Sequence, residues 1–182
     1  MSTAKQRGYF GFGAERISKP MNLGNLMRSA HAFGASFTFT VDANRTIGNP
    51  LSDTSNSPRH LPYYAWKSVA EMQLPRHCQL VGVEFLDEAT ELPSFRHPLR
   101  AAYVLGSERG SLSPGMLAKC DHVVKIPTAF CINLAVAGAI IMYDRVRSLG
   151  RFPPPPVGSR GPVEALAAHV HGKPVLRRED EA

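Results

Sequence analysis

The stretch Val124-Lys-Ile-Pro-Thr-Ala-Phe-Cys-Ile-Asn-Leu-Ala-Val-Ala-Gly138 decides the fold. It begins as a β-rich run, stops at Pro127, passes through a short loop and continues as an apolar helical pattern. A strand that leads into a buried helix is typical of α/β domains. Asn133 stands near the start of this helix among apolar residues. Because a buried amide needs hydrogen-bond partners, Asn133 is either a helix cap or a ligand contact.

The chain outside this stretch alternates between strands and helices in the same way. β-rich runs predict strands over Tyr9–Ile17, Ser36–Val41, Gln79–Phe85, Ala101–Leu105 and His122–Ile126. Apolar spacing predicts helices over Asn22–Phe33, Trp66–Gln73, Pro114–Lys119 and Leu134–Ser148, with Gly34 suited to a helix C-terminus. Residues 46–66 are rich in Pro, Ser and Asn and predict a loop. The alternation indicates an α/β domain with a mostly parallel sheet flanked by helices.

Composition indicates one globular domain followed by a tail. The chain has 182 residues, of which 43% are hydrophobic and 20% charged. We expect the domain over residues 1–150 and a Pro-rich, flexible tail over residues 151–182, with a short helix at Val163–Val170. The net charge of +6 lies mostly in residues 1–150 and permits an RNA partner without requiring one.

The cysteines and the apolar stretches bear on cell compartment and metal binding. Three cysteines, Cys78, Cys120 and Cys131, are too few for a disulfide scaffold, and their spacing fits no zinc site, so we expect a reducing cytoplasm and no metal. The longest apolar stretch, Ile132–Tyr143, has 12 residues. A membrane span needs roughly 20. No basic-then-apolar run of a signal peptide opens the chain. We therefore predict a cytoplasmic protein with no membrane partner.

The segment from Pro20 to Gly34 is the first candidate binding segment. Asn22, Asn25 and Ser29 share one face of the predicted helix, and Arg28 borders that face. No acidic residue lies at helical neighbour spacing from Arg28. The segment is therefore either a solvated polar face or a clamp that binds phosphate with Arg28.

A glycine-containing loop over Val104–Pro114 is the second candidate. Gly106 follows a predicted strand and would let a ligand approach the backbone closely. The glycine spacing matches neither a Walker motif nor Gly-x-Gly-x-x-Gly. The loop is either a tight turn or a ligand loop, and Glu108 is either an exposed carboxylate or a site residue. Cys131, in the third segment, is more typical of an inert buried thiol than of a nucleophile.

Taken in order, the three segments resemble the motifs of the SpoU (TrmH-like) branch of the SPOUT RNA methyltransferases. The first motif of that family is Asn-x-Gly-x-x-x-Arg-x-Ala, ending in Phe-Gly. The second is Leu-Gly-x-Glu-x-x-Gly, and the third is Ile-Pro followed by Ser-Leu-Asn-Val-Ser. The corresponding residues are Asn22, Gly24, Arg28, Ala30, Phe33 and Gly34, then Leu105, Gly106 and Glu108 with Gly110 one place early, then Ile126, Pro127 and Cys131–Ala135.

The resemblance implies a fold, a cofactor and a substrate. The fold is an α/β domain with a C-terminal trefoil knot that works as a homodimer. The cofactor is S-adenosylmethionine, held at Gly106, Ile126, Cys131 and Leu134. The substrate is RNA, usually a ribose 2'-hydroxyl of tRNA or rRNA.

The resemblance also implies a catalytic set of Arg28, Asn22, Glu108 and Asn133. A guanidinium stays protonated, so we expect Arg28 to bind phosphate and polarise the hydroxyl rather than to act as a base. Asn22 and Glu108 would then hold Arg28 or the ribose.

Departures from the family pattern leave alternatives open. Cys131 and Ala135 stand where the family usually has serines. The activity could therefore be base methylation on the same fold, or the chain could be a catalytically idle RNA-binding protein. A nucleotide-binding α/β protein of another kind is the remaining alternative. Candidate RNA-binding cations are Lys5, Arg7, Arg16, Lys19, Arg45, Arg59, Arg109, Arg145 and Arg147.

Overall fold

The structure is a computed structural model that describes residues 8–44, 61–108, 110–150, 157–158 and 161–162. The chain divides into two compact units, residues 1–151 and residues 152–182. The second unit contains an antiparallel strand pair, β8 (Val157–Gly158) and β9 (Gly161–Pro162). The helix predicted over Val163–Val170 lies outside the described residues. None of the described helices is long and apolar enough to cross a membrane.

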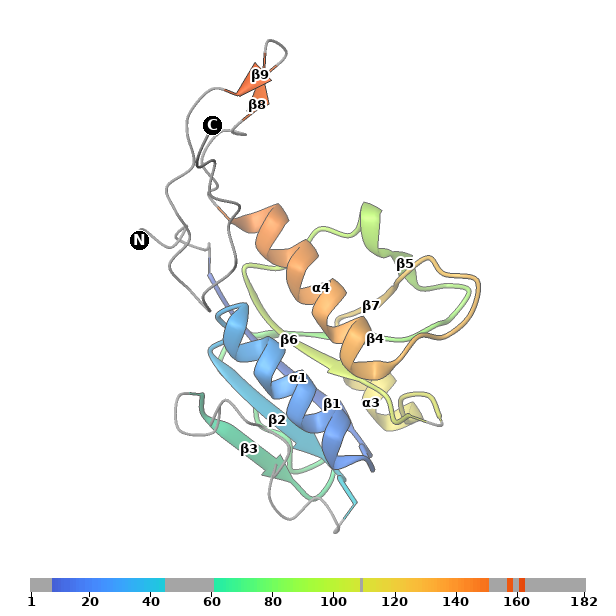
Figure 1. Ribbon diagram of the computed structural model, residues 1–182. Coiled ribbons are helices and arrows are strands. Elements are labelled where there is room, and N and C mark those ends of the chain that lie inside the picture. Colours follow the sequence, from blue (N-terminus) through green and yellow to red (C-terminus); the bar gives the residue numbers. More distant parts are fainter. Residues whose placement is uncertain (1–7, 45–60, 109, 151–156, 159–160, 163–182) are drawn as a thin grey trace. The chain divides into compact units, whose positions relative to one another are not determined.

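The first unit is built on a seven-stranded sheet in which every pairing is parallel (Figure 1). The strand order is β3-β2-β1-β6-β4-β7-β5. The carboxyl ends of these strands therefore meet at one edge of the sheet, where ligands bind in open α/β folds. The strands are β1 (Tyr9–Glu15), β2 (Phe37–Val41), β3 (Tyr63–Trp66), β4 (Gln79–Val83), β5 (Thr90–Glu91), β6 (Arg100–Leu105) and β7 (His122–Lys125).

Helices cover both faces of the sheet. Figure 1 shows α1 (Pro20–Ala32) and α4 (Leu134–Leu149) side by side across one face. Their apolar residues pack with Phe10 and Phe12 in one core cluster. The short α3 (Pro114–Lys119) packs through Met116 into a second cluster with Phe37 and Phe39. A 3₁₀ turn, η1 (Leu92–Ser94), follows β5. The predicted α/β class with a mostly parallel sheet is confirmed.

Close packing of α1 on α4 depends on a small residue in α4. A Cβ atom built on Gly138 would lie 2.4 Å from Leu26 Cδ1 and 3.3 Å from Phe12 Cε1. Any larger residue there would push the two helices apart or displace Leu26. This contact matters for the site, because Asn22 lies in α1 and Asn133 caps the start of α4.

The region from 61 to 73 differs from the prediction. The sequence predicts a loop over 46–66 and a helix over Trp66–Gln73. The structure instead has β3 at Tyr63–Trp66, followed by turns and no helix. Tyr63–Trp66 pairs with Thr38–Val41, and Trp66 packs on Phe39 with the ring centroids 5.5 Å apart. Aromatic packing on the neighbouring strand favours an edge strand over local helical propensity. The short β5 and η1 are also absent from the prediction.

Candidate functional site

A cavity of about 470 Å³ lies at the carboxyl edge of the sheet, within the range of small-molecule sites. Its walls come from the ends of β4, β6 and β7 and from the start of α4. The structure brings together there all the sequence-predicted site residues except Arg28. They are Asn22, Gly106, Glu108, Ile126, Cys131, Asn133 and Leu134.

Three of these residues form one hydrogen-bonded chain that joins the three sequence segments. Asn22 Nδ2 donates to Glu108 Oε1 at 3.1 Å. Asn22 Oδ1 accepts from Asn133 Nδ2 at 3.2 Å. Asn22 is almost fully buried, with 8% of its surface exposed. Its amide therefore fixes the loop after β6 and the start of α4 relative to α1.

Glu108 caps a helix that is distant in sequence. The first turn of α1 has no acidic residue, and its N-cap Lys19 makes no side-chain cap. Glu108 Oε2 accepts from Ser18 N at 3.0 Å and from Ser18 Oγ at 2.9 Å, and Oε1 accepts from Lys19 N at 2.9 Å. A carboxylate at this end also complements the helix dipole.

These contacts set the protonation state of Glu108. Burial alone would raise the pKa of the Glu108 carboxyl, but the hydrogen bonds from backbone amides, including those of Ser18 and Lys19, and from Asn22 outweigh it. The net result is a pKa below the usual value. Glu108 is therefore ionised at neutral pH.

Asn133 is a helix cap, which is one of the two roles that the sequence predicts for it. Its Oδ1 accepts from Ala135 N at 2.9 Å and from Val136 N at 3.3 Å at the start of α4. The same side chain lines the cavity and donates to Asn22. The cap role is confirmed, and a ligand contact stays a prediction.

The cysteines differ from one another in exposure. Cys131 is exposed and lines the cavity, so the expectation of a buried thiol is wrong. It lies in the loop before α4. Burial raises the pKa of Cys78 and raises that of Cys120 to about 11. These two thiols are therefore less reactive than an exposed one.

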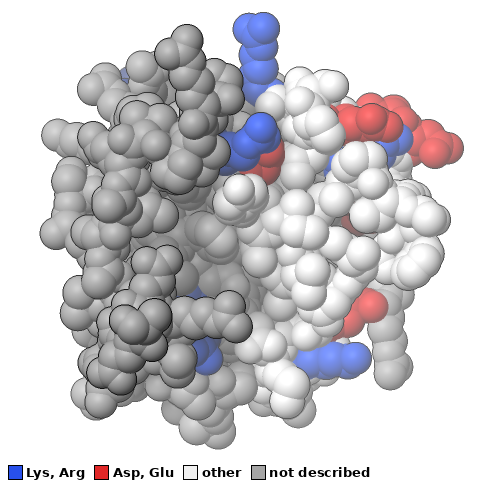
Figure 2. All heavy atoms as spheres, turned by 45° about the horizontal axis from the view of Figure 1, so that its top comes forward, with Lys and Arg blue, Asp and Glu red and all other residues white. Residues whose placement is uncertain are grey.

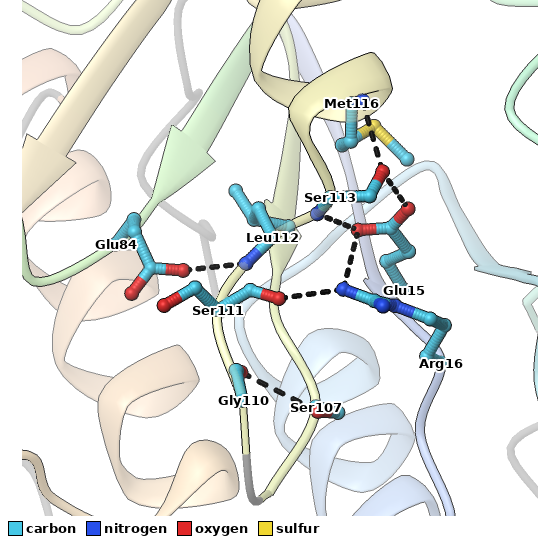
Figure 3. A network of polar contacts seen from close by, with 9 residues as sticks. All are labelled: Glu15, Arg16, Glu84, Ser107, Gly110, Ser111, Leu112, Ser113 and Met116. Carbon is cyan, nitrogen blue, oxygen red and sulfur yellow. Dashed lines mark hydrogen bonds and ion pairs between the residues drawn. The ribbon is translucent and has the colours of Figure 1, made fainter.

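The loop after β6 is held by carboxylates that sequence reasoning missed (Figure 3). Glu84, after β4, accepts from Leu112 N at 2.7 Å, and the buried Glu15, at the end of β1, accepts from Ser113 N at 2.7 Å. Arg16 Nη2 donates to Ser111 O at 2.7 Å. The available signal was an acidic residue ending an otherwise apolar strand, which occurs in both Tyr9–Ile17 and Gln79–Phe85.

Gly106 is required by the path of its own loop. A Cβ atom there would lie 2.9 Å from Gly110 O and 3.0 Å from Leu112 N. Both neighbours are backbone atoms, so a larger residue would displace the loop that walls the cavity. The path of the loop is therefore one reason for glycine at position 106. The close approach of a ligand, which the sequence predicts, is a second reason.

Arg28 lies outside the cavity, on a neighbouring hollow of about 580 Å³ between α1 and α4. Asn25, Ser29 and Tyr143 also line this hollow, and Asn133 lines both it and the cavity. Through Asn133, the structure therefore places Arg28 next to the other predicted catalytic residues rather than inside the cavity.

The predicted basic residues do not all reach the surface. Arg145 is fully buried, so the prediction that it could bind RNA is wrong. Its guanidinium donates to Tyr9 O at 3.1 Å, Leu99 O at 3.0 Å and Tyr103 Oη at 3.2 Å. Arg16, Lys19 and Arg147 are exposed. Figure 2 shows described Lys and Arg side chains scattered among Asp and Glu on one face. Lys5, Arg7, Arg45 and Arg59 lie outside the described residues, as does Arg109.

Within the described ranges, no group of three or more His, Cys, Asp or Glu side chains could hold a metal ion. The cavity is lined by charged, polar and apolar residues, such as Glu84, Asn22 and Ile126. Such a cavity at the carboxyl ends of parallel strands suits an organic ligand.

Residues 11–143 match the SpoU rRNA methylase family, so the chain belongs to that family. This match includes all eight predicted site residues. It also agrees with the fold, because solved SpoU-type enzymes share this architecture.

The chain spans only part of the length of the proteins that it is similar to. The mouse tRNA (guanosine(18)-2'-O)-methyltransferase TARBP1 is 29% identical over 160 residues, which are 78% of this chain and 10% of that protein. The Bacillus subtilis protein YacO, of the TrmH family, is 27% identical over 145 residues, 73% of this chain and 56% of YacO. The AdoMet-bound rRNA methyltransferase of Sinorhizobium meliloti superposes with a TM-score of 0.68 at 23% identity. That superposition covers 79% of this chain and 58% of the other.

Proposed function

We propose that residues 1–150 form an S-adenosylmethionine-dependent RNA methyltransferase domain and residues 151–182 a tail. The acceptor is a ribose 2'-hydroxyl of tRNA or rRNA. The observation that carries the proposal is the cavity in which the three family motifs meet, joined by the chain Glu108–Asn22–Asn133. The name of the mouse relative supports ribose 2'-O-methylation of tRNA.

The cavity fits an adenosyl cofactor in size and chemistry. Apolar side chains such as Ile126 and Leu134 offer a surface for a purine, and carboxylates and lysines offer partners for charged groups. Gly106, Ile126, Cys131 and Leu134 would hold the cofactor. When bound, S-adenosylmethionine supplies an electrophilic methyl group on a sulfonium sulfur.

The catalytic set would act by positioning the acceptor. Asn22, Glu108 and Asn133 hold one another, so the cavity wall is fixed before RNA arrives. Arg28, on the neighbouring hollow, would bind an RNA phosphate and polarise the hydroxyl. Its guanidinium stays protonated and therefore attracts phosphate at any physiological pH.

We propose a homodimer that covers the α1–α4 face. Val136 and Tyr143 are 51% and 60% exposed and line the same hollow, and neighbouring exposed apolar side chains of this kind favour an interaction surface. A second copy on this face would bring its own groups close to Arg28 and Asn133.

The trefoil knot is also part of the proposal. Its support is membership of the SpoU family, because the resemblance to that family implies such a knot.

The cytoplasm is the proposed compartment. The three cysteines are all free thiols, which suits a reducing environment.

The first test is calorimetric titration of the protein with S-adenosylhomocysteine, followed by transfer of labelled methyl to total tRNA and rRNA. We expect binding in the micromolar range (about 1–100 µM) and label in a 2'-O-methylnucleoside. Label in a base would replace the acceptor assignment. Cofactor binding without transfer to any RNA would indicate an idle protein, and no binding would refute the proposal.

The role of Arg28 has its own matched test. Arg28→Lys should lower methyl transfer, because lysine keeps the charge but loses the planar guanidinium. Arg96→Lys, at an exposed position that lines neither the cavity nor the hollow, is the control and should leave transfer unchanged. Equal transfer by both variants would remove Arg28 from the catalytic set.

A further inference from the structure

Glu84 lies on the cavity wall, directly after β4. β4 pairs with β6 on one side and with β7 on the other, so Glu84 is central among the strand ends that form the cavity. Its neighbours Val83 and Phe85 line the same cavity. A carboxylate is therefore presented to a ligand at the carboxyl edge of the sheet, where α/β folds bind their cofactors.

The two cavity carboxylates differ in how much hydrogen-bonding capacity they retain. A carboxylate has about four lone-pair sites. Glu108 accepts four hydrogen bonds, two at each oxygen, and its sites are occupied. Within the described part of the chain, Glu84 accepts only two, from Leu112 N at Oε2 and from Phe85 N at Oε1, the latter at 3.0 Å. Glu84 therefore keeps sites for donors of a ligand.

The orientation of the Glu84 carboxylate and its lack of a nearby cation in the described ranges indicate which kind of ligand group it can bind. In Figure 3 one carboxylate oxygen is directed at Leu112 and the other points away from the loop. Among the described residues, no Lys, Arg or His lies within ion-pair distance of Glu84. A ligand that covers this half-buried anion must bring hydrogen-bond donors, since leaving it without partners is unfavourable.

We infer that Glu84 is a cofactor-binding residue whose carboxylate accepts hydrogen bonds from the ribose 2'- and 3'-hydroxyls of the adenosyl group. A vicinal diol carries two adjacent O–H donors and matches the two oxygens of a carboxylate. Acidic residues near strand ends bind ribose hydroxyls in the same way in dinucleotide-binding folds. The inference rests on the proposed function, because it names the residue that holds one part of that cofactor.

Glu84→Gln tests this role with little damage to the loop. The glutamine carbonyl oxygen can still accept from Leu112 N, so the loop stays attached to the end of β4. The contact with Phe85 N, the next residue in the chain, is lost because the NH₂ group then faces it. Glu88→Gln, at an exposed position four residues further on that does not line the cavity, is the matched control. Thermal unfolding of all three proteins establishes that they are folded before binding is compared.

The binding experiment is calorimetry with S-adenosylhomocysteine and with its 2'-deoxy and 3'-deoxy analogues. We expect Glu84→Gln to weaken binding of the parent compound by about 10- to 100-fold, as for hydrogen bonds to a charged group. The deoxy analogues should bind the wild type and Glu88→Gln more weakly than the parent compound does. They should bind Glu84→Gln within about twofold of the parent compound, because the shared contact is already lost.

The outcomes separate this inference from the proposed function. If removal of either hydroxyl weakens binding to Glu84→Gln as much as to the wild type, Glu84 does not contact the ribose and the inference is overturned. Failure of the wild type to bind S-adenosylhomocysteine at all would overturn the proposed function, and the inference with it. A purely structural role of Glu84 would weaken all ligands by one common factor.

Discussion

Replacement of Glu108 by glutamine isolates the link between the loop after β6 and the start of α1. All four groups that reach the Glu108 carboxylate are donors: Ser18 N, Ser18 Oγ, Lys19 N and Asn22 Nδ2. A glutamine amide presents an NH₂ group on one side, whichever way it is turned. That NH₂ group would face a backbone N–H, which cannot rotate away. At least one amide at the start of α1 therefore loses its partner.

The magnitude follows from this count. A hydrogen bond to a charged group contributes about 1.5–3 kcal/mol when buried. Glu108 is half-buried, and water can replace part of the lost contact, so we reduce this to about 1–2 kcal/mol. Loss of a negative charge at the helix start adds about 0.3–1 kcal/mol. We expect Glu108→Gln to lower the free energy of unfolding by about 2 kcal/mol, or the melting temperature by about 4–8 °C.

The effect should depend on pH in a defined direction. The folded-state pKa of Glu108 is lowered, so its stabilisation is present above the unfolded pKa of about 4.3 and is lost as pH falls through the folded value. The difference between wild type and Glu108→Gln should therefore be full at pH 7 and shrink towards pH 3. Urea denaturation at both pH values measures it.

Two results would refute this reasoning. One is a difference in unfolding free energy below about 0.3 kcal/mol at pH 7, which is within the usual scatter of surface substitutions. The other is an equal difference at pH 7 and at pH 3, which would mean that ionisation of Glu108 is not the cause. Glu88→Gln serves as the control, since Glu88 is exposed and lies outside the cavity.

Three further predictions concern packing, the buried arginine and the exposed thiol. Gly138→Leu should lower unfolding free energy by about 1–3 kcal/mol in urea denaturation, because its Cβ would already lie 2.4 Å from Leu26 Cδ1; an unchanged midpoint would contradict the close helix contact. Arg145→Met should lower the free energy of unfolding by about 3 kcal/mol or more, because the carbonyl groups of Tyr9 and Leu99 lose their donor. The same substitution at the exposed Arg147 should have little effect on the free energy of unfolding. Iodoacetamide should label Cys131 before Cys120, as read by peptide mass spectrometry, and S-adenosylhomocysteine should protect Cys131. Labelling of Cys131 that the ligand does not slow would place this thiol away from the cofactor.

Local patterns predicted most of the elements that carry the site. The prediction of a helix over Asn22–Phe33 matches α1, and that over Leu134–Ser148 matches α4, because apolar spacing along a helix depends on its own residues. The strand β3 escaped prediction because its stability comes from Phe37 and Phe39 on the neighbouring strand. The residues of a strand do not by themselves show which other strand it will pair with.

The burial of Arg145 could have been predicted from the same spacing. Ile141 and Met142 lie four and three residues before Arg145, so all three share the buried stripe of α4. An arginine on such a stripe must find acceptors inside the protein, and Arg145 finds them at Tyr9 and Leu99. The prediction that Arg145 contacts RNA conflicts with this periodicity.

The contacts of Glu108 and Arg28 limit how this site can act. A general base for a hydroxyl works best when its pKa lies near the operating pH. The pKa of Glu108 is lowered and its oxygens already accept four hydrogen bonds, so it has neither the basicity nor the free lone pair that the task requires. A guanidinium such as that of Arg28 stays protonated. The contacts of Glu108 instead join α1 to the loop that walls the cavity, and through Asn22 they join both to the start of α4.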